Sequence, residues 1–207
     1  MNRSVKTRNM VLTAVIAAII ILMAFTPVGY INLVVIKATL IHVPVIIGSV
    51  VLGPKKGAFL GFIFGLTSLI NNTFNPSLLS FAFSPFYSGG NLWSIVICFV
   101  PRILTGVVPY FVFKGIMWLG NGSKKAEYAA LPAAGAVGAL VNTLLVMNLI
   151  YFCFSGQFAT VREIAVSAVY DVIVGIIVAN GVPEAIVAAV LTLALGKVLL
   201  HLNFNRG

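Results

Sequence analysis

Acidic residues are scarce in this chain: four Asp and Glu stand against thirteen Lys and Arg in 207 residues. Only two cysteines are present, Cys98 and Cys153, and both lie in apolar stretches without metal-ligand spacing around them. The motifs H-E-x-x-H and G-x-S-x-G do not occur, and residues 53–57 lack the spacing of a phosphate-binding loop. We therefore expect no enzyme, no ATPase, no metal site and no bound cofactor.

Apolar residues dominate what is present. The chain is 60% hydrophobic and 8% charged, with a mean hydropathy of +1.11, which is typical of an integral membrane protein and not of a water-soluble domain. The net charge of +9 raises the possibility of nucleic-acid binding. However, the cations are scattered between apolar runs, with no basic groove and no aromatic stacking platform, so we expect no nucleic-acid partner.

Six apolar segments are long enough to be membrane spans. Crossing about 30 Å of hydrocarbon takes roughly 20 residues of helix. The segments are 10–25, 33–52, 57–74, 92–119, 129–154 and 183–202. The sequence therefore predicts an all-α, multi-pass membrane protein with six transmembrane helices in a single domain, residues 1–207.

Basic residues orient these predicted spans, because cytoplasmic loops retain Lys and Arg. An even number of spans places both termini on one side, and the basic ends of the chain make that side cytoplasmic. Lys37, Arg102 and Arg162 depart from the pattern. The cations that follow it are Arg3, Lys6, Arg8, Lys55, Lys56, Lys114, Lys124, Lys125, Lys197 and Arg206.

The segment 159–179 is apolar enough to suggest a seventh span, but it carries Arg162, Glu163 and Asp171. A seventh crossing would also move the basic C-terminus to the outside. We therefore expect an extra outer helix between helices five and six, which lies on the protein or dips into it without crossing.

The outer connection at 71–91 combines amide side chains with many aromatic rings, which indicates a lid over a pocket. The alternative is an aromatic belt at the headgroup level, which suits Tyr87 and Trp93. As substrate-binding candidates this connection supplies Asn71, Asn75, Tyr87, Asn91 and Trp93.

Charged and amide residues within the spans supply further candidates. Arg102 lies in mid-helix, where a cation costs about 2.5–3.5 kcal/mol, so it should face a polar interior. Lys37 either contributes to the same pocket or extends to the headgroups. Asn142 and Asn148 either contact a ligand or join helices through hydrogen bonds.

Residues 180–184, Asn-Gly-Val-Pro-Glu, have the pattern of a helix start, and the free N–H groups there would favour an anion. Asn180 is therefore a further substrate-binding candidate. With Arg102, the candidates indicate a small ligand that bears a carboxylate and amide or hydroxyl groups.

Small residues mark two packing faces. Gly57, Gly61 and Gly65 form a stripe that suits close helix packing. Ala14 and Ala18 share one face of the first helix, and this face either packs internally or contacts a partner subunit.

These patterns together resemble the substrate-binding S components of energy-coupling factor (ECF) vitamin transporters. The likeness rests on Leu-Gly-Pro-Lys-Lys-Gly-Ala at 52–58 leading into Gly61 and Gly65, on Ala14 and Ala18, and on the segments 100–106 and 181–185. The stretch from Ile-His-Val-Pro at 41–44 to 71–76 is most like the pantothenate-specific members.

The resemblance implies a binding subunit in the bacterial cell membrane. Its partners would be a membrane T component, docked on Ala14 and Ala18, and two cytoplasmic ATPases. The lid would close over a B vitamin, most simply pantothenate. Alternatives are another vitamin (folate, riboflavin or a pyrimidine precursor) or a stand-alone channel or secondary carrier.

Overall fold

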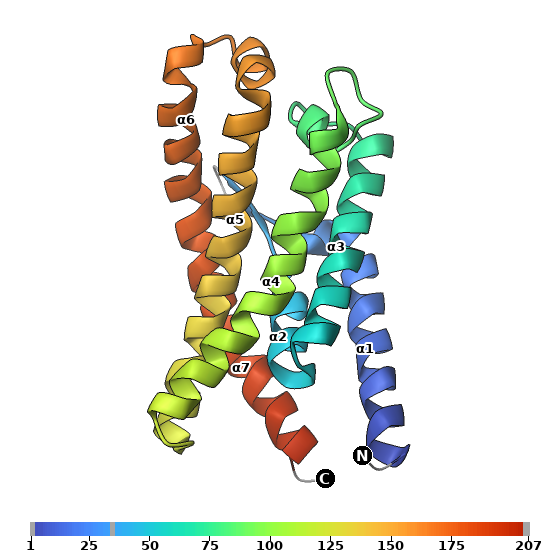
Figure 1. Cartoon of the computed structure of the whole chain (residues 1–207), viewed down its shortest axis with the longest axis vertical. Helices are drawn as coiled ribbons and strands as arrows, with labels where there is room; N and C mark the ends of the chain where they lie inside the picture. The colour runs from blue at the N-terminus through green and yellow to red at the C-terminus, as the bar shows by residue number, and fades with distance from the viewer. Residues whose placement is uncertain (1–2, 34–35, 205–207) are drawn as a thin grey trace.

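The computed structural model describes residues 3–33 and 36–204, and of residues 3–4, 28, 30–33, 36–38 and 202–204 it describes only the backbone. Helices aligned along one axis form an elongated bundle (Figure 1). In chain order the elements are α1 (Arg3–Ala24), β1 (Tyr30–Leu33), β2 (Ile36–Thr39), α2 (His42–Leu52), α3 (Pro54–Phe74), α4 (Leu92–Leu119), α5 (Lys124–Arg162), α6 (Val169–Ile176) and α7 (Val182–Phe204).

Five helical stretches within the described residues are long and apolar enough to cross a membrane: Val5–Ala24, Pro54–Phe74, Leu92–Leu119, Lys124–Arg162 and Val166–His201. They confirm a predominantly helical membrane protein. The predicted span 92–119 coincides with α4, and the predicted spans 10–25 and 57–74 fall within or close to α1 and α3.

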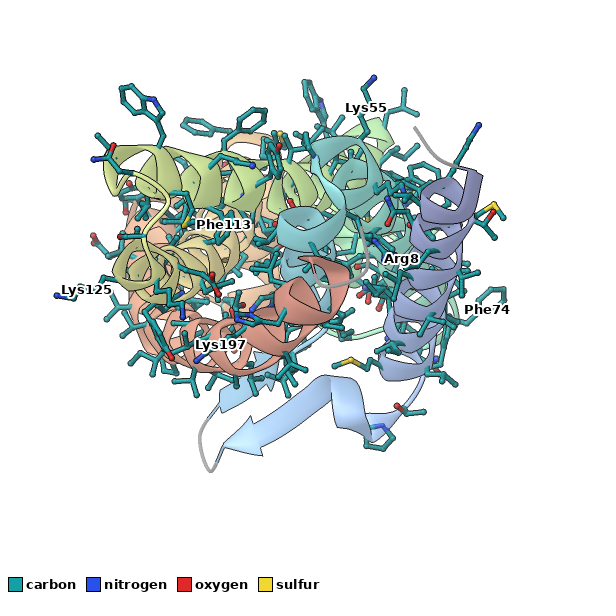
Figure 2. The ribbon with its side chains drawn as sticks, turned by 90° about the horizontal axis from the view of Figure 1, so that it is seen from below. Arg8, Lys55, Phe74, Phe113, Lys125 and Lys197 are labelled. Atoms are coloured by element: carbon teal, nitrogen blue, oxygen red, sulfur yellow. The ribbon has the colours of Figure 1, made fainter. Side chains whose placement is uncertain are left out.

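The predicted second span, 33–52, is wrong as a continuous helix. Its N-terminal part belongs to an antiparallel hairpin in which Asn32 pairs with Lys37 and Tyr30 with Thr39, and Figure 2 shows this hairpin at one side of the helices. Among the described residues of the predicted span, the only helix is α2. Its 11 residues extend about 16 Å, which is about half the thickness of a hydrocarbon core. Residues 31–39 are rich in Val, Ile and Thr, and these β-branched side chains favour strands.

Proline and glycine set the ends of α2. Pro44 occupies the first turn of α2, where a missing backbone N–H costs no helical hydrogen bond. Gly53 follows the helix with φ at 92°, a conformation that L side chains rarely adopt, and Pro54 then begins α3. Pro44 therefore marks a helix start and not a bend within a span.

The outer helix expected over 159–179 is not a separate element. Its first residues complete α5, where Glu163 adopts a left-handed conformation (φ 55°) and ends the helix. The rest runs through α6 and a π-helical turn, Ile177–Gly181, directly into α7. The helix start predicted at 180–184 agrees in position with α7, which begins at Val182, but the π turn runs directly into α7, so no free helix N-terminus is present there. Pro183 lacks the N–H that an α-helix would use at this point, and the wider π turn precedes it.

Both chain termini lie at the same end of the bundle (Figure 1). The turn between α2 and α3 and the turn between α4 and α5 also approach this end. Figure 2 views the molecule from there, with Arg8, Lys55, Lys125 and Lys197 labelled on the helices. Basic residues near the starts of α1, α3 and α5 thus lie toward this end of the bundle, whereas Arg102 lies inside α4 and Arg162 at the C-terminal end of α5.

Close contact between α3 and α4 depends on the glycine stripe. A Cβ on Gly57 would lie 1.9 Å from the carbonyl oxygen of Gly106, and one on Gly61 would lie 2.2 Å from that of Arg102. A Cβ on Gly65 would lie 2.8 Å from the carbonyl oxygen of Cys98. The two helix backbones therefore lie in close contact from Gly57 to Gly65, which fixes the backbone of Arg102 against α3.

This contact predicts that Gly61→Ala destabilises the protein by about 1–3 kcal/mol, because the added methyl group forces α3 away from α4. Thermal unfolding of the purified protein in detergent measures the effect. Gly115→Ala in α4 is the matched control, since a Cβ there meets no atom within 4 Å, and it should leave stability unchanged or slightly raised. Equal melting temperatures for the two variants would contradict the packing described.

Candidate functional site

A cavity of about 510 Å³ lies between the helices, the hairpin and the loop that follows α3. Its walls come from the ends of α1 and β2, the second half of α3, the loop 75–91, α4 and α5. The lining residues are Ala24, Pro27, Thr39, Ile41, Phe64, Thr67, Ser68, Asn71, Asn72, Asn75, Ser77, Phe83, Arg102 and Asn142. The volume is typical of a site for a small molecule.

Arg102 is the cation in this lining. Its side chain is only 6% exposed, and its Nη1 donates a hydrogen bond of 2.6 Å to the carbonyl oxygen of Ile97. The guanidinium carbon lies 5.5 Å from the ring centre of Phe64 and 5.1 Å from that of Phe83. A cation close to two aromatic rings is favourable when it is shielded from water, so α3, α4 and the loop 75–91 together hold the guanidinium in place.

Amide side chains gather near the end of α3. Asn75 donates to the Oδ1 of Asn71 at 3.0 Å, and Asn72 donates to the carbonyl oxygen of Ser68 at 2.9 Å. Across the cavity, the Oδ1 of Asn142 on α5 is buried and has no hydrogen-bond partner among the described residues. A buried acceptor of this kind is costly to leave unpaired, and a ligand donor would satisfy it.

The loop 75–91 is fixed over the cavity by hydrogen bonds to its neighbours. Ser80 donates to the Oδ1 of Asn72 at 3.0 Å, and the hydroxyls of Thr73 and Ser84 lie 2.8 Å apart. Cys98 in α4 donates to the carbonyl oxygen of Phe83 at 2.9 Å. These contacts place Phe83 in the lining, next to Arg102.

An apolar cluster also anchors this loop. Phe81 is 2% exposed, and its ring centre lies 5.6 Å from that of Phe154 on α5. Ile97, Ile150 and Ile173 belong to the same buried cluster, which therefore joins the loop to α4, α5 and α6. The loop is packed like an element of the core and not like a solvated connection.

Glu184 joins the hairpin to the helices behind it. This carboxylate is buried, and it accepts hydrogen bonds from the backbone N–H of Thr39 at 2.9 Å and from the hydroxyl of Thr143 at 3.0 Å. Thr39 ends β2 and lines the cavity. Glu184 thus holds one wall of the cavity against α5 and α7.

The structure brings together part of the predicted set. Asn71, Asn75, Arg102 and Asn142 line one cavity. For Lys37, the backbone lies in β2, but the side chain is outside what the structure describes.

The other predicted residues lie away from the lining. Asn91 caps α4 by accepting from the N–H of Trp93 at 2.8 Å, and Trp93 is 53% exposed, while Tyr87 is 38% exposed. Asn148 donates to the carbonyl oxygen of Leu144 in its own helix. Asn180 lies in the π-helical turn, so it precedes no free helix N-terminus.

Several lining residues have no strong signal in the sequence. Thr67 and Ser68 look like ordinary small residues of a membrane helix, and Thr67 bonds to the carbonyl oxygen of Phe64 in its own helix. Thr39 was not a binding candidate because the hydropathy of its segment predicts a transmembrane helix. Asn72 and Ser77 lie within two residues of Asn71 and Asn75, and their position in the sequence could have added them to the binding candidates.

The chemistry of the site is that of recognition. A buried guanidinium can form charge-assisted hydrogen bonds with a carboxylate, and no described acidic residue lines the cavity to compete with such a ligand. The amides and hydroxyls can bond to polar groups, and Ala24, Ile41 and Phe64 offer apolar contact. Within the described residues, no group of His, Cys, Asp and Glu could hold a metal ion.

The face of α1 that carries Ala14 and Ala18 is exposed. Ile16 and Ile20, on the opposite face, pack into a buried cluster with Leu60 and Phe64 of α3. The helix is therefore peripheral to the bundle, and its small-residue face is not used for packing within this chain.

Comparison with known proteins agrees with this arrangement. The sequence model of the family described as "ECF transporter, substrate-specific component" matches residues 8–196. A pantothenic acid transporter, PanT, from Lactococcus lactis subsp. cremoris is 37% identical over 175 residues, covering 82% of this chain and 81% of the relative. A pantothenate transporter, PanT, from Leuconostoc mesenteroides subsp. mesenteroides is 32% identical over 209 residues, covering 98% of this chain and 97% of the relative.

The contacts of Glu184 predict that Glu184→Ala lowers the free energy of unfolding by about 1–3 kcal/mol, because its hydrogen bonds to Thr39 and Thr143 are lost and the partly buried N–H of Thr39 is left unpaired. Thermal unfolding in detergent measures this effect. Thr143→Val removes one of the two bonds and should cost clearly less. Glu184→Ala and Thr143→Val melting at the same temperature would show that the bond to the hairpin contributes nothing.

Proposed function

The chain belongs to the family of ECF transporter substrate-specific components, and we propose that it captures pantothenate at the outer face of a bacterial membrane and passes it inward. As a transport component it is not an enzyme, and its role is to bind and present a ligand. We propose that movement is driven by partners, a membrane T component and two cytoplasmic ATPases, as the family implies.

The observation that carries the substrate proposal is the buried guanidinium of Arg102 in the cavity. Pantothenate has one carboxylate, one amide, two hydroxyls and a branched apolar carbon. The carboxylate suits Arg102, since planar bidentate pairing favours arginine. The amide and hydroxyls suit Asn71, Asn75 and Asn142, and the branched carbon suits the apolar walls. The two PanT relatives support the same substrate.

The direction of uptake follows from the distribution of charge. The end that carries both termini also carries most of the basic residues, which favours a cytoplasmic location for it. The cavity is lined by the C-terminal half of α3 and by the loop 75–91, which belong to the opposite end. We therefore place the ligand entrance on the outside.

The docking surface proposed for the T component is the exposed face of α1 around Ala14 and Ala18. Small residues let another helix backbone approach closely, which is how helices associate in lipid. The cavity is lined from the end of α1 but not by this face, so docking and ligand binding use separate groups.

The substrate proposal predicts that purified protein binds pantothenate and that Arg102→Ala raises its Kd by about tenfold to a hundredfold, the equivalent of a lost charge-assisted hydrogen bond of roughly 1.5–3 kcal/mol. Isothermal titration measures it. Pantothenol, in which an alcohol replaces the carboxylate, is the matched ligand: it should bind the native protein more weakly and be little affected by the substitution.

Tight binding of folate, riboflavin or a pyrimidine precursor, with no binding of pantothenate, would reject the substrate and leave the family role intact. Concentrative uptake into liposomes that hold this chain alone would instead support a secondary carrier, and would overturn the dependence on partner subunits.

The docking proposal predicts that Ala14→Trp lowers the affinity for the coupling subunits at least about tenfold, or ~1.4 kcal/mol, because the bulky ring separates the helix backbones. Co-purification with the T component and ATPases measures assembly. Ala129→Trp, an equal change on an exposed position of α5, is the control and should assemble normally. Pantothenate Kd should stay within about twofold in both variants, and a loss of ligand binding by Ala14→Trp would contradict separate surfaces.

A further inference from the structure

Pro101 and Arg102 are consecutive residues inside α4, and their contacts are linked through one carbonyl group. In an unbroken α-helix the N–H of residue 101 would donate to the carbonyl oxygen of residue 97. Proline has no N–H, so Pro101 leaves the carbonyl of Ile97 without that donor. The same carbonyl oxygen accepts the 2.6 Å hydrogen bond from the Nη1 of Arg102.

The direction of the side chain makes this bond possible. Side chains on a helix lean toward its N-terminus, so that of Arg102 extends back along α4 toward Ile97. Ile97 is fully buried, and its carbonyl would be costly to leave unpaired in a membrane-embedded bundle. The guanidinium therefore satisfies a buried acceptor, and in return the acceptor fixes the orientation of the guanidinium.

Contacts with α3 and with two aromatic rings also hold Arg102 in place. Gly61 brings the backbone of α3 against the carbonyl group of Arg102, and the guanidinium carbon lies 5.5 and 5.1 Å from the ring centres of Phe64 and Phe83. These contacts hold the guanidinium at the cavity, and the bond to Ile97 sets the rotation of its N–H groups, because a guanidinium has its five donors in a fixed planar fork.

We propose that Pro101 is a positioning residue for ligand binding: by withholding a backbone donor, it reserves the carbonyl of Ile97 for Arg102 and so aims the guanidinium into the cavity. The proposal rests on the proposed role of Arg102 in binding a carboxylate. It assigns Pro101 a purpose other than a bend, and α4 contains an internal comparison, because Pro109 also lies in the helix interior but does not line the cavity.

The test compares Pro101→Ala with Pro109→Ala in purified full-length protein, using titration with pantothenate and with pantothenol. Alanine at 101 restores an N–H that competes for the Ile97 carbonyl. Pantothenate Kd should rise about tenfold, with pantothenol Kd changed less than about twofold, since only the carboxylate ligand uses the guanidinium. Pro109→Ala should leave the ratio of the two Kd values unchanged.

A variant with lactic acid at position 101, introduced by nonsense suppression, separates the missing donor from the proline ring. Its ester linkage has no N–H and no ring, so it should keep the native preference for pantothenate over pantothenol. The variant also decides the matter if Pro101→Ala fails to fold.

An unchanged preference in Pro101→Ala, or a lost preference in the lactic acid variant, would overturn the proposal. Weakening of both ligands to the same extent by Pro101→Ala would also overturn it, because that is the effect of a distorted helix. A native protein that binds no pantothenate would instead refute the proposed function, so the two failures are distinguishable.

Discussion

A guanidinium buried inside a lipid-embedded bundle is the constraint on which the site depends. Arg102 is 6% exposed in α4, and an uncompensated cation at that depth would be strongly unfavourable. The bundle compensates it with a carbonyl acceptor from its own helix, two aromatic rings and a polar cavity. No described acidic residue lines the cavity, so a small anion bound there would meet the guanidinium without a competing carboxylate. The proposed role of the protein, capture of a small anion, is the natural consequence.

Two features enclose this cation, and they are held by different interactions. The loop 75–91 is anchored by the apolar packing of Phe81 and by hydrogen bonds to α3 and α4. The hairpin is tied to the helices by the carboxylate of Glu184. A ligand-binding subunit must open to load and close to retain its ligand.

The sequence was informative about the long helices and less so about the segments between them. The span 92–119 coincides with α4, because hydropathy is a strong signal over that length. Hydropathy does not distinguish a short apolar strand from a helix, so it predicts a transmembrane helix that includes residues 33–39. The charges of Arg162 and Glu163 predict that residues 159–179 form a helix that does not cross the membrane. In the structure they end α5, and the apolar residues that follow continue into α7.

Site residues could be predicted from the sequence where a polar or charged residue lies within an apolar span. Arg102 and Asn142 are conspicuous because charged and amide groups are costly at membrane depth, and both line the cavity. Thr67 and Ser68 are not conspicuous, because small hydroxyl residues can bond to their own helix backbone. Tyr87 and Trp93 suited an aromatic belt as well as a lid, and both are exposed, whereas only the packing of the loop could reveal that Phe83 lines the cavity. The most direct test of the account is a structure determined with pantothenate bound. The account predicts the carboxylate oxygens at about 2.7–2.9 Å from the guanidinium nitrogens of Arg102, and a carboxylate bound away from Arg102, or an Arg102 side chain facing lipid, would contradict it.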